Sequence, residues 1–345
     1  MLSRIAIPPP DTVAAAAAEA ELAEKTMPPG ALGRVGRLAV TMAAAQGRAV
    51  PSADPAEALV FAADHGIVAE GVSAWPQAVT ALMVEVLARG AAAAPVLAES
   101  AGVAITVIDA GVASPYRTPP PGLSGAPVRA GTRNAAIEDA LTAEEVAAAL
   151  DLGAEAAAAA LARGARVLLP GEMGIGNTAT AALLAHAVAG LPLDTLTGPG
   201  AGLDPAGVTA KGAVLARAAA RRPGPCVPEA ALACFGGLEV AAMAGAMIAG
   251  AGGRAVVLVD GFIATAAALL AVTARPEIAP YLLYAHRSAE PGHRAMLAHL
   301  GAEPLLDLDL RLGEGTGALL AFPLLRASCR VLAEMATFES AGIPR

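Results

Sequence analysis

The sequence predicts an α/β fold built on a mostly parallel sheet with helices on both faces. From residue 58 onward, short apolar runs alternate with longer segments of helical pattern, an order typical of strand–helix–strand units. Each run is apolar throughout, as in strands that are covered on both faces. The predicted strands are Ala58–Ala63, Val103–Ile108, Val167–Leu169, Ala255–Val259, Tyr281–Ala285 and Pro304–Leu308.

Both ends of the chain are predicted to be helical. An alanine-rich helix is expected over residues 11–24 and a second over 32–45, with the helix-breaking run Pro28-Pro29-Gly30 between them. A further helix is expected from Gly317 to about Thr337. We therefore expect an α/β domain over residues 55–310 and a small helical domain formed by residues 1–54 and 311–345.

Charged side chains follow the predicted strands. Open parallel sheets bind their ligands outside the carboxyl ends of the strands. A functional site is therefore expected at that edge of the sheet. The charged residues that gather there are Asp64, His65, Asp109, Glu172, Asp260, His286, Arg287, Arg311 and Glu314.

The stretch from Gly171 to Thr180 has the order of an anion site. It follows the predicted strand Val167–Leu169 and precedes a helix predicted over 181–188. A glycine-rich turn at a helix N-terminus offers free backbone N–H groups and a positive helix end. The negative charge of the Glu172 carboxylate would repel a bound phosphate, which suggests that Glu172 has a separate role. A tight connection that binds no ligand is the alternative.

Two other segments each allow two interpretations. The segment from Asp64 to Pro76 holds Ser73 and Trp75, the only tryptophan of the chain, and forms either a slot for a flat ring or a loop covering the core. The segment Arg311–Gly317 places Glu314 among three glycines. Its carboxylate is either a general base or a partner for the next helix N-terminus.

Composition and charge exclude several classes of function. The chain has 345 residues, a net charge of −8 and no block of basic residues, which argues against a nucleic-acid partner. The apolar window 230–252 contains Glu239 and is predicted to be a buried helix rather than a membrane span. The chain start lacks the apolar core of a signal peptide. The cysteines, without metal-site spacing, are expected to be reduced thiols of a cytoplasmic protein: Cys226, Cys234 and Cys329.

A loose dinucleotide-binding pattern leaves an NAD-linked oxidoreductase as an alternative. Gly174-x-Gly176-x-x-Ala179 follows a predicted strand, but the expected ribose-binding acid about 20 residues further on is missing. The sequence also lacks a glycine-rich P-loop, which argues against nucleoside triphosphate hydrolysis.

Several motifs taken together resemble one enzyme family, the nicotinate-nucleotide–dimethylbenzimidazole phosphoribosyltransferases. The similarity runs from about Pro28 to Glu334. The motifs that carry it are Asp64-His65-Gly66, Gly71-Val72-Ser73, Gly171-Glu172-Met173-Gly174-Ile175-Gly176-Asn177-Thr178, Gly202-Leu203-Asp204, His286-Arg287-Ser288 and Arg311-Leu312-Gly313-Glu314-Gly315-Thr316-Gly317.

This resemblance implies a Rossmann-like sheet, a helical domain from both termini and a homodimer. It implies transfer of phosphoribose from nicotinate mononucleotide to 5,6-dimethylbenzimidazole, giving α-ribazole 5′-phosphate and nicotinate for the lower ligand of cobalamin. It implies Glu314 as the catalytic base and Glu172 near the ring and ribose. Substrate contacts are implied around the phosphate and ribose at Gly174, Gly176, Asn177, Thr178, Lys211 and Ser288, and around the base at Ser73 and Leu312.

The chain departs from the family pattern at two places. Leu82 stands near the base pocket where a glutamine is common, so it is the residue expected to influence the choice of azole. Gly198-Pro199-Gly200-Ala201-Gly202 stands where the family more often has Gly-Arg-Gly-Thr-Gly.

The expected reaction needs neither a metal nor a cofactor. Nicotinate leaves a pyridinium donor as a neutral pyridine, which requires no acid. The attacking azole must lose one proton, for which a single carboxylate suffices. A nucleotide- or azole-binding sensor without catalysis is the non-enzymatic alternative, and the presence of both Glu314 and Glu172 argues against it.

Overall fold

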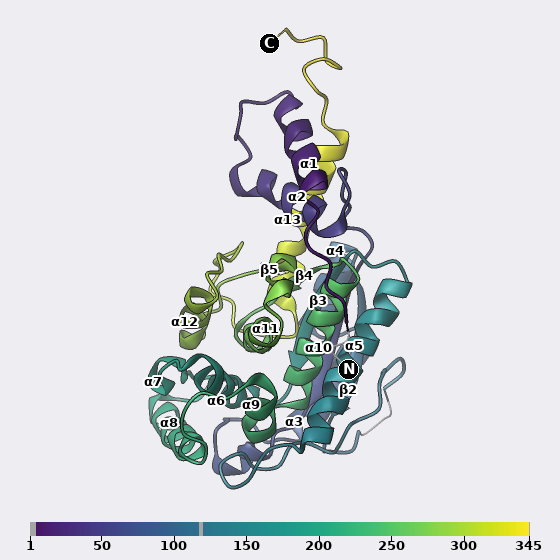
Figure 1. Ribbon diagram of the computed structural model, residues 1–345. Coiled ribbons are helices and arrows are strands. Elements are labelled where there is room, and N and C mark those ends of the chain that lie inside the picture. The colour runs from purple at the N-terminus through teal and green to yellow at the C-terminus, as the bar shows by residue number, and fades with distance from the viewer. Residues whose placement is uncertain (1–4, 117–119, 345) are drawn as a thin grey trace.

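The computed structural model describes residues 5–116 and 120–344, which fold around a five-stranded parallel sheet (Figure 1). The strand order is β2-β1-β3-β4-β5 and every neighbouring pair is parallel. The predicted α/β class is therefore confirmed. The strands are β1 (Ala56–Ala63), β2 (Ala104–Gly111), β3 (Val167–Met173), β4 (Val256–Val259) and β5 (Leu282–Tyr284).

The sixth predicted strand is wrong. Within Pro304–Leu308 only Leu306 forms an isolated bridge, to His286. Pro304 has no N–H to donate to a ladder, and Leu308 is 57% exposed. The run therefore passes along the sheet edge without extending the sheet.

The helices connect and cover the strands. The short 3₁₀ segments are η2 (Gly66–Glu70) and η3 (Pro276–Tyr281). The α-helices are α1 (Thr12–Glu24), α2 (Gly33–Gln46), α3 (Val79–Ala88), α4 (Ala93–Ala101), α5 (Ala143–Ala162), α6 (Asn177–Ala189), α7 (Leu193–Leu196), α8 (Pro205–Ala220), α9 (Pro228–Phe235), α10 (Leu238–Gly252), α11 (Phe262–Ala274), α12 (Pro291–His299) and α13 (Thr316–Glu334).

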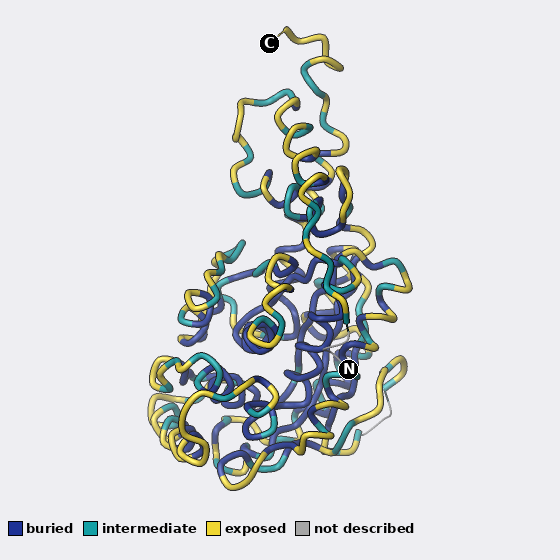
Figure 2. The backbone as a smooth tube through the Cα atoms, in the orientation of Figure 1, coloured by how far each residue is buried: buried dark blue, intermediate teal, exposed yellow. Residues whose placement is uncertain are grey.

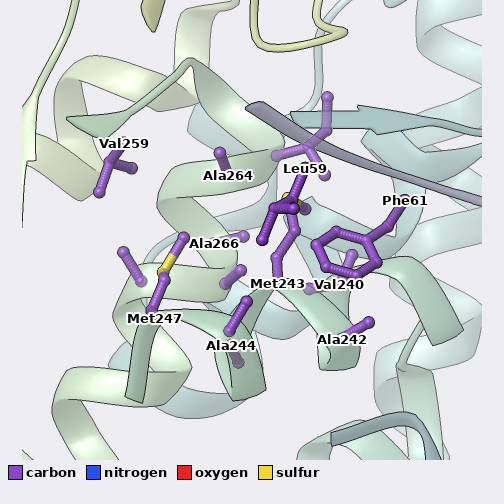
Figure 3. Close-up of a cluster of buried hydrophobic side chains, with 14 of the residues drawn as sticks. Leu59, Phe61, Val240, Ala242, Met243, Ala244, Met247, Val259, Ala264 and Ala266 are labelled. Atoms are coloured by element: carbon purple, nitrogen blue, oxygen red, sulfur yellow. The ribbon is translucent and has the colours of Figure 1, made fainter. Parts of the chain in front are cut away.

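The core lies between the sheet and α10, whose residues 238–251 are all buried. The predicted helix over 230–252 is largely buried, but it is divided at Gly236-Gly237 into α9 and α10. Figure 3 shows Leu59 and Phe61 of β1 against Met243 of α10. Helices α5 and α10 pack closely because small residues meet at their crossing. A Cβ atom on Gly153 would lie 1.7 Å from the carbonyl oxygen of Ala242, so only glycine permits this approach.

Helices from both termini meet at one end of the molecule, where Figure 1 shows α1 and α2 beside α13. A small apolar cluster joins them: Ala18, Ala39, Ala43 and Leu332. Buried Lys25 donates to the carbonyl of Met335 at 2.9 Å, and Lys25 also forms a backbone bridge with Thr337. The burial colours in Figure 2 show that this end is largely exposed, unlike the sheet below it. Helix α13 packs on β3 and β4 as well as on α1 and α2, so it contacts both of the expected domains. The domain boundary expected near residue 311 therefore stays a prediction.

Two apolar stretches are long enough to cross a membrane by length and composition, Val79–Ala101 and Thr316–Glu334. The first is divided into α3 and α4, and α3 packs against the sheet. In the second, the buried residues of α13 include Phe322 and Leu325. Core helices of globular proteins have the same composition.

Candidate active site

A cavity of about 770 Å³ opens at the carboxyl ends of β3, β4 and β5, the edge at which the sequence places its charged residues. Its polar wall comprises Glu172, Asn177, Thr178, Asp260, His286, Ser288, Glu290, Asp309, Arg311 and Glu314. Its apolar wall includes Trp75, Val79, Met83, Ile175, Phe262, Ile263, Leu310 and Leu312. One cavity therefore offers a polar region and an apolar region side by side.

The glycine turn is shorter than the sequence suggests. Strand β3 continues through Glu172 to Met173, and α6 begins at Asn177, four residues before the predicted start. Asn177 and Thr178 therefore form the first turn of the helix instead of lying in the loop. Gly176, the residue before the helix, has a φ of 95°, a conformation that favours glycine.

Lys211 of α8 lies behind this turn. It is buried, and its Nζ donates to Thr178 Oγ1 at 2.8 Å and to the carbonyl of Gly198 at 3.1 Å. Burial lowers the pKa of Lys211 to about 8, and the charge of Glu290 opposes this effect. A lysine next to a helix N-terminus is suited to bind a phosphate.

Glu172 is a buried carboxyl on the edge of β3. Asn177 donates a short hydrogen bond to Glu172 Oε2, and the backbone carbonyl of Glu172 accepts from the N–H of Glu314 at 3.1 Å. Burial raises the pKa of Glu172 well above its usual value, and the charges of Glu239, Asp260 and Glu314 raise it further. Burial and neighbouring charges therefore both favour the protonated form of Glu172.

Glu314 is held by its backbone in an unusual conformation. Its φ is 62°, and it lies between Gly313 and Gly315, which also have positive φ. A non-glycine residue in this region is strained and marks functional sites. The loop presses on β3 so closely that a Cβ atom on Gly171 would lie 2.6 Å from the backbone of Glu314.

The Glu314 carboxylate is buried and accepts a hydrogen bond from the N–H of Ala94, in α4, at 3.3 Å. Ala94 lies in the first turn of α4, so the Glu314 carboxylate caps the N-terminus of α4 and not that of α13, the helix that follows it. Burial raises the pKa of Glu314, and the bond from Ala94 opposes that rise. A carboxylate of raised pKa is a stronger base when ionised.

Buried polar groups also line the side of the cavity formed by the segments that follow β4 and β5. Asp260 Oδ1 accepts from the N–H of Ala318 at 2.9 Å, and His286 Nε2 lies 3.7 Å from the same oxygen. His293 Nδ1 accepts from the N–H of Ser288 at 2.7 Å and fixes that segment. Burial lowers the pKa of His293 to about 3, so the ring is neutral.

Glu290 is a site residue that the sequence analysis missed. It precedes α12 rather than following a strand, so the pattern of charged residues after strands does not select it. Glu290 is 5% exposed and lines the cavity. Burial raises its pKa, while the charges of Lys211 and Arg311 lower it.

The apolar region lies under two loops that meet over the cavity. Trp75 Nε1 donates to the carbonyl of Ala201 at 3.1 Å, and Arg311 donates to that of Gly200 at 3.0 Å. Trp75 is 53% exposed and Leu312 is 61% exposed, so both stand at the cavity mouth. Trp75 therefore borders a slot rather than covering the core.

Some predicted contact residues do not line the cavity. Val79 and Met83 of α3 line the cavity, whereas Leu82 of the same helix does not. Ser73 lies beside the mouth, where its Oγ accepts from the N–H of Trp75 at 3.2 Å. Gly176 and Lys211 lie behind the wall, next to Thr178. Of the charged residues predicted at this edge, four also lie outside the lining: Asp64, His65, Asp109 and Arg287.

Comparison with known proteins assigns the chain to a family. Residues 7–343 match the family described as "Phosphoribosyltransferase". The nicotinate-nucleotide–dimethylbenzimidazole phosphoribosyltransferase of Ralstonia nicotianae is 51% identical over 96% of this chain and 94% of its own length. The protein of the same name from Pseudomonas aeruginosa is 48% identical over 92% of this chain and 91% of its own length.

A solved structure agrees with the sequence match. The crystal structure of the enzyme of this name from Thermus thermophilus superposes with a TM-score of 0.91 and 46% identity, covering 97% of this chain and 99% of that one. The chain belongs to the nicotinate-nucleotide–dimethylbenzimidazole phosphoribosyltransferase family. Membership confirms the resemblance carried by the sequence motifs. It supports neither the NAD-linked oxidoreductase nor the non-catalytic sensor.

Proposed function

We propose that this phosphoribosyltransferase transfers phosphoribose from nicotinate mononucleotide to 5,6-dimethylbenzimidazole or a related azole. The products are α-ribazole 5′-phosphate and nicotinate, in the synthesis of the cobalamin lower ligand. The observation that carries the proposal is one cavity with a lysine-backed helix N-terminus in its polar region and a buried carboxylate, Glu314, beside its apolar slot.

The phosphate is proposed to bind at the start of α6. Gly174, Gly176, Asn177 and Thr178 supply the turn and the helix N-terminus, and Lys211 supplies the positive charge. Ser288, fixed by His293, faces the ribose from the opposite wall.

The azole is proposed to lie in the apolar slot under Trp75, next to Leu312. Ser73 and Leu82 act from outside the lining, through Trp75 and through Met83 respectively. Hydrophobic slots of this kind orient a flat ring with few polar contacts.

Glu314 is proposed to act as the base. One azole nitrogen attacks the anomeric carbon, the bond from that carbon to nicotinate breaks, and its electron pair stays on the pyridine nitrogen. The N–H of the other azole nitrogen gives its proton to the Glu314 carboxylate, which later releases it to water. Glu172, with its pKa raised by burial, offers a hydrogen bond to the ring or ribose in its protonated form.

Product analysis tests the reaction. The protein is incubated with nicotinate mononucleotide and a panel of azoles, and products are identified by mass spectrometry. We expect a ribazole phosphate and an equal amount of nicotinate. Binding of both substrates without product would favour the sensor instead, and reduction of a nicotinamide cofactor would favour the oxidoreductase.

The protein is also proposed to act in the cytoplasm as a homodimer. Free Cys226, Cys234 and Cys329 are consistent with a reducing compartment. Val96 of α4 and Leu320 of α13 leave apolar side chains exposed on two helices that pack together. Sedimentation velocity tests the dimer, and a monomer at micromolar concentration would contradict it.

A further inference from the structure

The Asp64-His65 motif lies outside the cavity, and the proposed reaction gives it no task. His65 and Glu239 are both fully buried, and His65 Nε2 lies 2.9 Å from Glu239 Oε1. They come from different elements, since His65 follows β1 and Glu239 is in the first turn of α10. Burying an ion pair is costly, so its presence requires a reason beyond stability.

The His65–Glu239 pair contacts α6, the helix that follows the glycine turn. His65 Nδ1 lies 2.9 Å from Thr180 Oγ1, within hydrogen-bond distance. The imidazole therefore links Glu239 of α10 to Thr180 of α6. Burial lowers the pKa of His65, but the contact with Glu239 and the charge of Asp64 together outweigh this effect and leave the pKa raised.

The turn packs against the segment that carries His65. A Cβ atom on Gly174 would lie 2.4 Å from the carbonyl oxygen of Ala63 and 3.2 Å from His65 Nε2, and one on Gly176 would lie 2.6 Å from Val68 Cγ2 and 3.3 Å from His65 Cβ. The space around the pair is equally tight, because a Cβ atom on Gly237 would lie 2.5 Å from His65 Cε1. The ring therefore has one position, and the turn is packed directly against it.

A second contact holds the middle of the turn. Thr80 Oγ1, in α3, accepts from the N–H of Ile175 at 3.1 Å. Asp64 Oδ2 accepts from the N–H of Ala113 at 2.8 Å, which fixes the segment that carries His65. The turn is therefore held in its middle by Thr80, and the start of α6 is held by His65 through Thr180.

We infer that the buried His65–Glu239 pair is a positioning device that holds the 174–176 turn and the start of α6 in the geometry that binds the donor phosphate. This inference rests on the proposed function, because it assigns the phosphate of nicotinate mononucleotide to that turn. A site for the phosphate needs its N–H groups fixed before binding, since ordering them afterwards lowers affinity. His65 and Glu239 are positioning residues and do not touch substrate.

The test compares donor and acceptor in the same variants. Glu239→Gln keeps the shape and removes the charge, and Thr180→Val removes the link to α6. The matched control is Glu57→Gln, since Glu57 is a buried carboxylate at the other end of β1, paired with Arg163. Dissociation constants for nicotinate mononucleotide and dimethylbenzimidazole are measured by calorimetry, KM and kcat by product formation, and stability by thermal unfolding.

We expect both site variants to weaken donor binding and raise donor KM by about tenfold, as for loss of one buried hydrogen bond to a charged group. In Thr180→Val, acceptor binding and kcat stay within about twofold of the wild type, and Glu57→Gln loses stability alone. Thr180→Val carries the test if Glu239→Gln does not fold. Unchanged donor binding in a folded variant, or equal losses for both substrates, would overturn the inference.

The outcome also separates this inference from the proposed reaction. Wild-type protein that binds nicotinate mononucleotide but forms no product would refute the reaction. The binding comparison between wild type and variants would still decide the role of His65 and Glu239.

Discussion

Replacing Gly171 with alanine is expected to disable the site without touching a substrate contact. The added Cβ atom would lie 2.6 Å from the carbonyl carbon of Glu314 and from the nitrogen of Gly315. Ordinary contact begins at 3.4 Å, so β3 and the Glu314 loop must separate by about 0.8 Å. The contacted atoms are backbone, and no side chain can rotate away to relieve the clash.

The magnitude follows from this displacement. A misplacement of about 1 Å in a catalytic group costs about 10²-fold in rate, so kcat should fall by about 10- to 100-fold. Overpacking of this kind costs about 1–3 kcal/mol of stability. The assay is steady-state product formation at saturating substrates, with thermal unfolding measured in parallel.

A second glycine provides the control for this variant. Gly212 lies inside α8, and a Cβ atom there meets no atom within 4 Å. Gly212→Ala should leave kcat unchanged and stabilise the protein by about 0.5–1 kcal/mol, as alanine does inside a helix. A folded Gly171→Ala variant with wild-type kcat would refute the view that close packing on β3 positions Glu314.

Three further predictions concern the donor, the acceptor and pH. Lys211→Ala should raise the donor KM by about 10- to 100-fold, because it removes a charge-assisted contact of roughly 1.5–3 kcal/mol; an unchanged donor KM contradicts the phosphate assignment. The preference for dimethylbenzimidazole over benzimidazole, measured as a ratio of kcat/KM, should stay within about 1–3 kcal/mol per methyl group, as in an apolar pocket, and a much larger ratio argues against an apolar slot near Leu82 and Leu312. The pH profile of kcat/KM should have two limbs. On the acid side activity should be lost at a pH above 4.5, because burial raises the pKa of Glu314 and only the ionised carboxylate is a base. On the basic side activity should be lost near pH 8, where Lys211 loses its charge. Lys211→Arg should remove the basic limb alone, and a limb that persists assigns it to another group.

The sheet was predictable because its strands are short, apolar and covered on both faces. The runs at residues 58, 167 and 255 each correspond to a strand whose start lies within two residues of the prediction. Strand ends were harder to place. β3 continues through Gly171 and Glu172, residues of low strand propensity, because the β1 ladder on one side and the Glu314 loop on the other hold them extended.

The site was predictable where it follows the strands and hidden where it does not. Glu172 lies at the end of β3, Asp260 and His286 follow β4 and β5, and all three line the cavity as the topology of a parallel sheet requires. Glu314 also lines it, although the strand predicted before it does not form. Glu290 lies before a helix, and Val79 and Met83 belong to an apolar helix that looks like core from its sequence. Their role depends on which helix face meets the cavity, and that is decided by tertiary packing.

The most direct test of the proposed chemistry compares Glu314→Gln with Glu172→Gln at saturating substrates. Both changes keep the side-chain shape, so binding of nicotinate mononucleotide and azole, measured by calorimetry, should persist. The account predicts that kcat for ribazole phosphate falls by about 10²–10⁴-fold in Glu314→Gln, the typical cost of losing a general base, and falls less in Glu172→Gln. A dead Glu172→Gln variant beside a Glu314→Gln variant of near-normal kcat would contradict the assignment and make Glu172 the base.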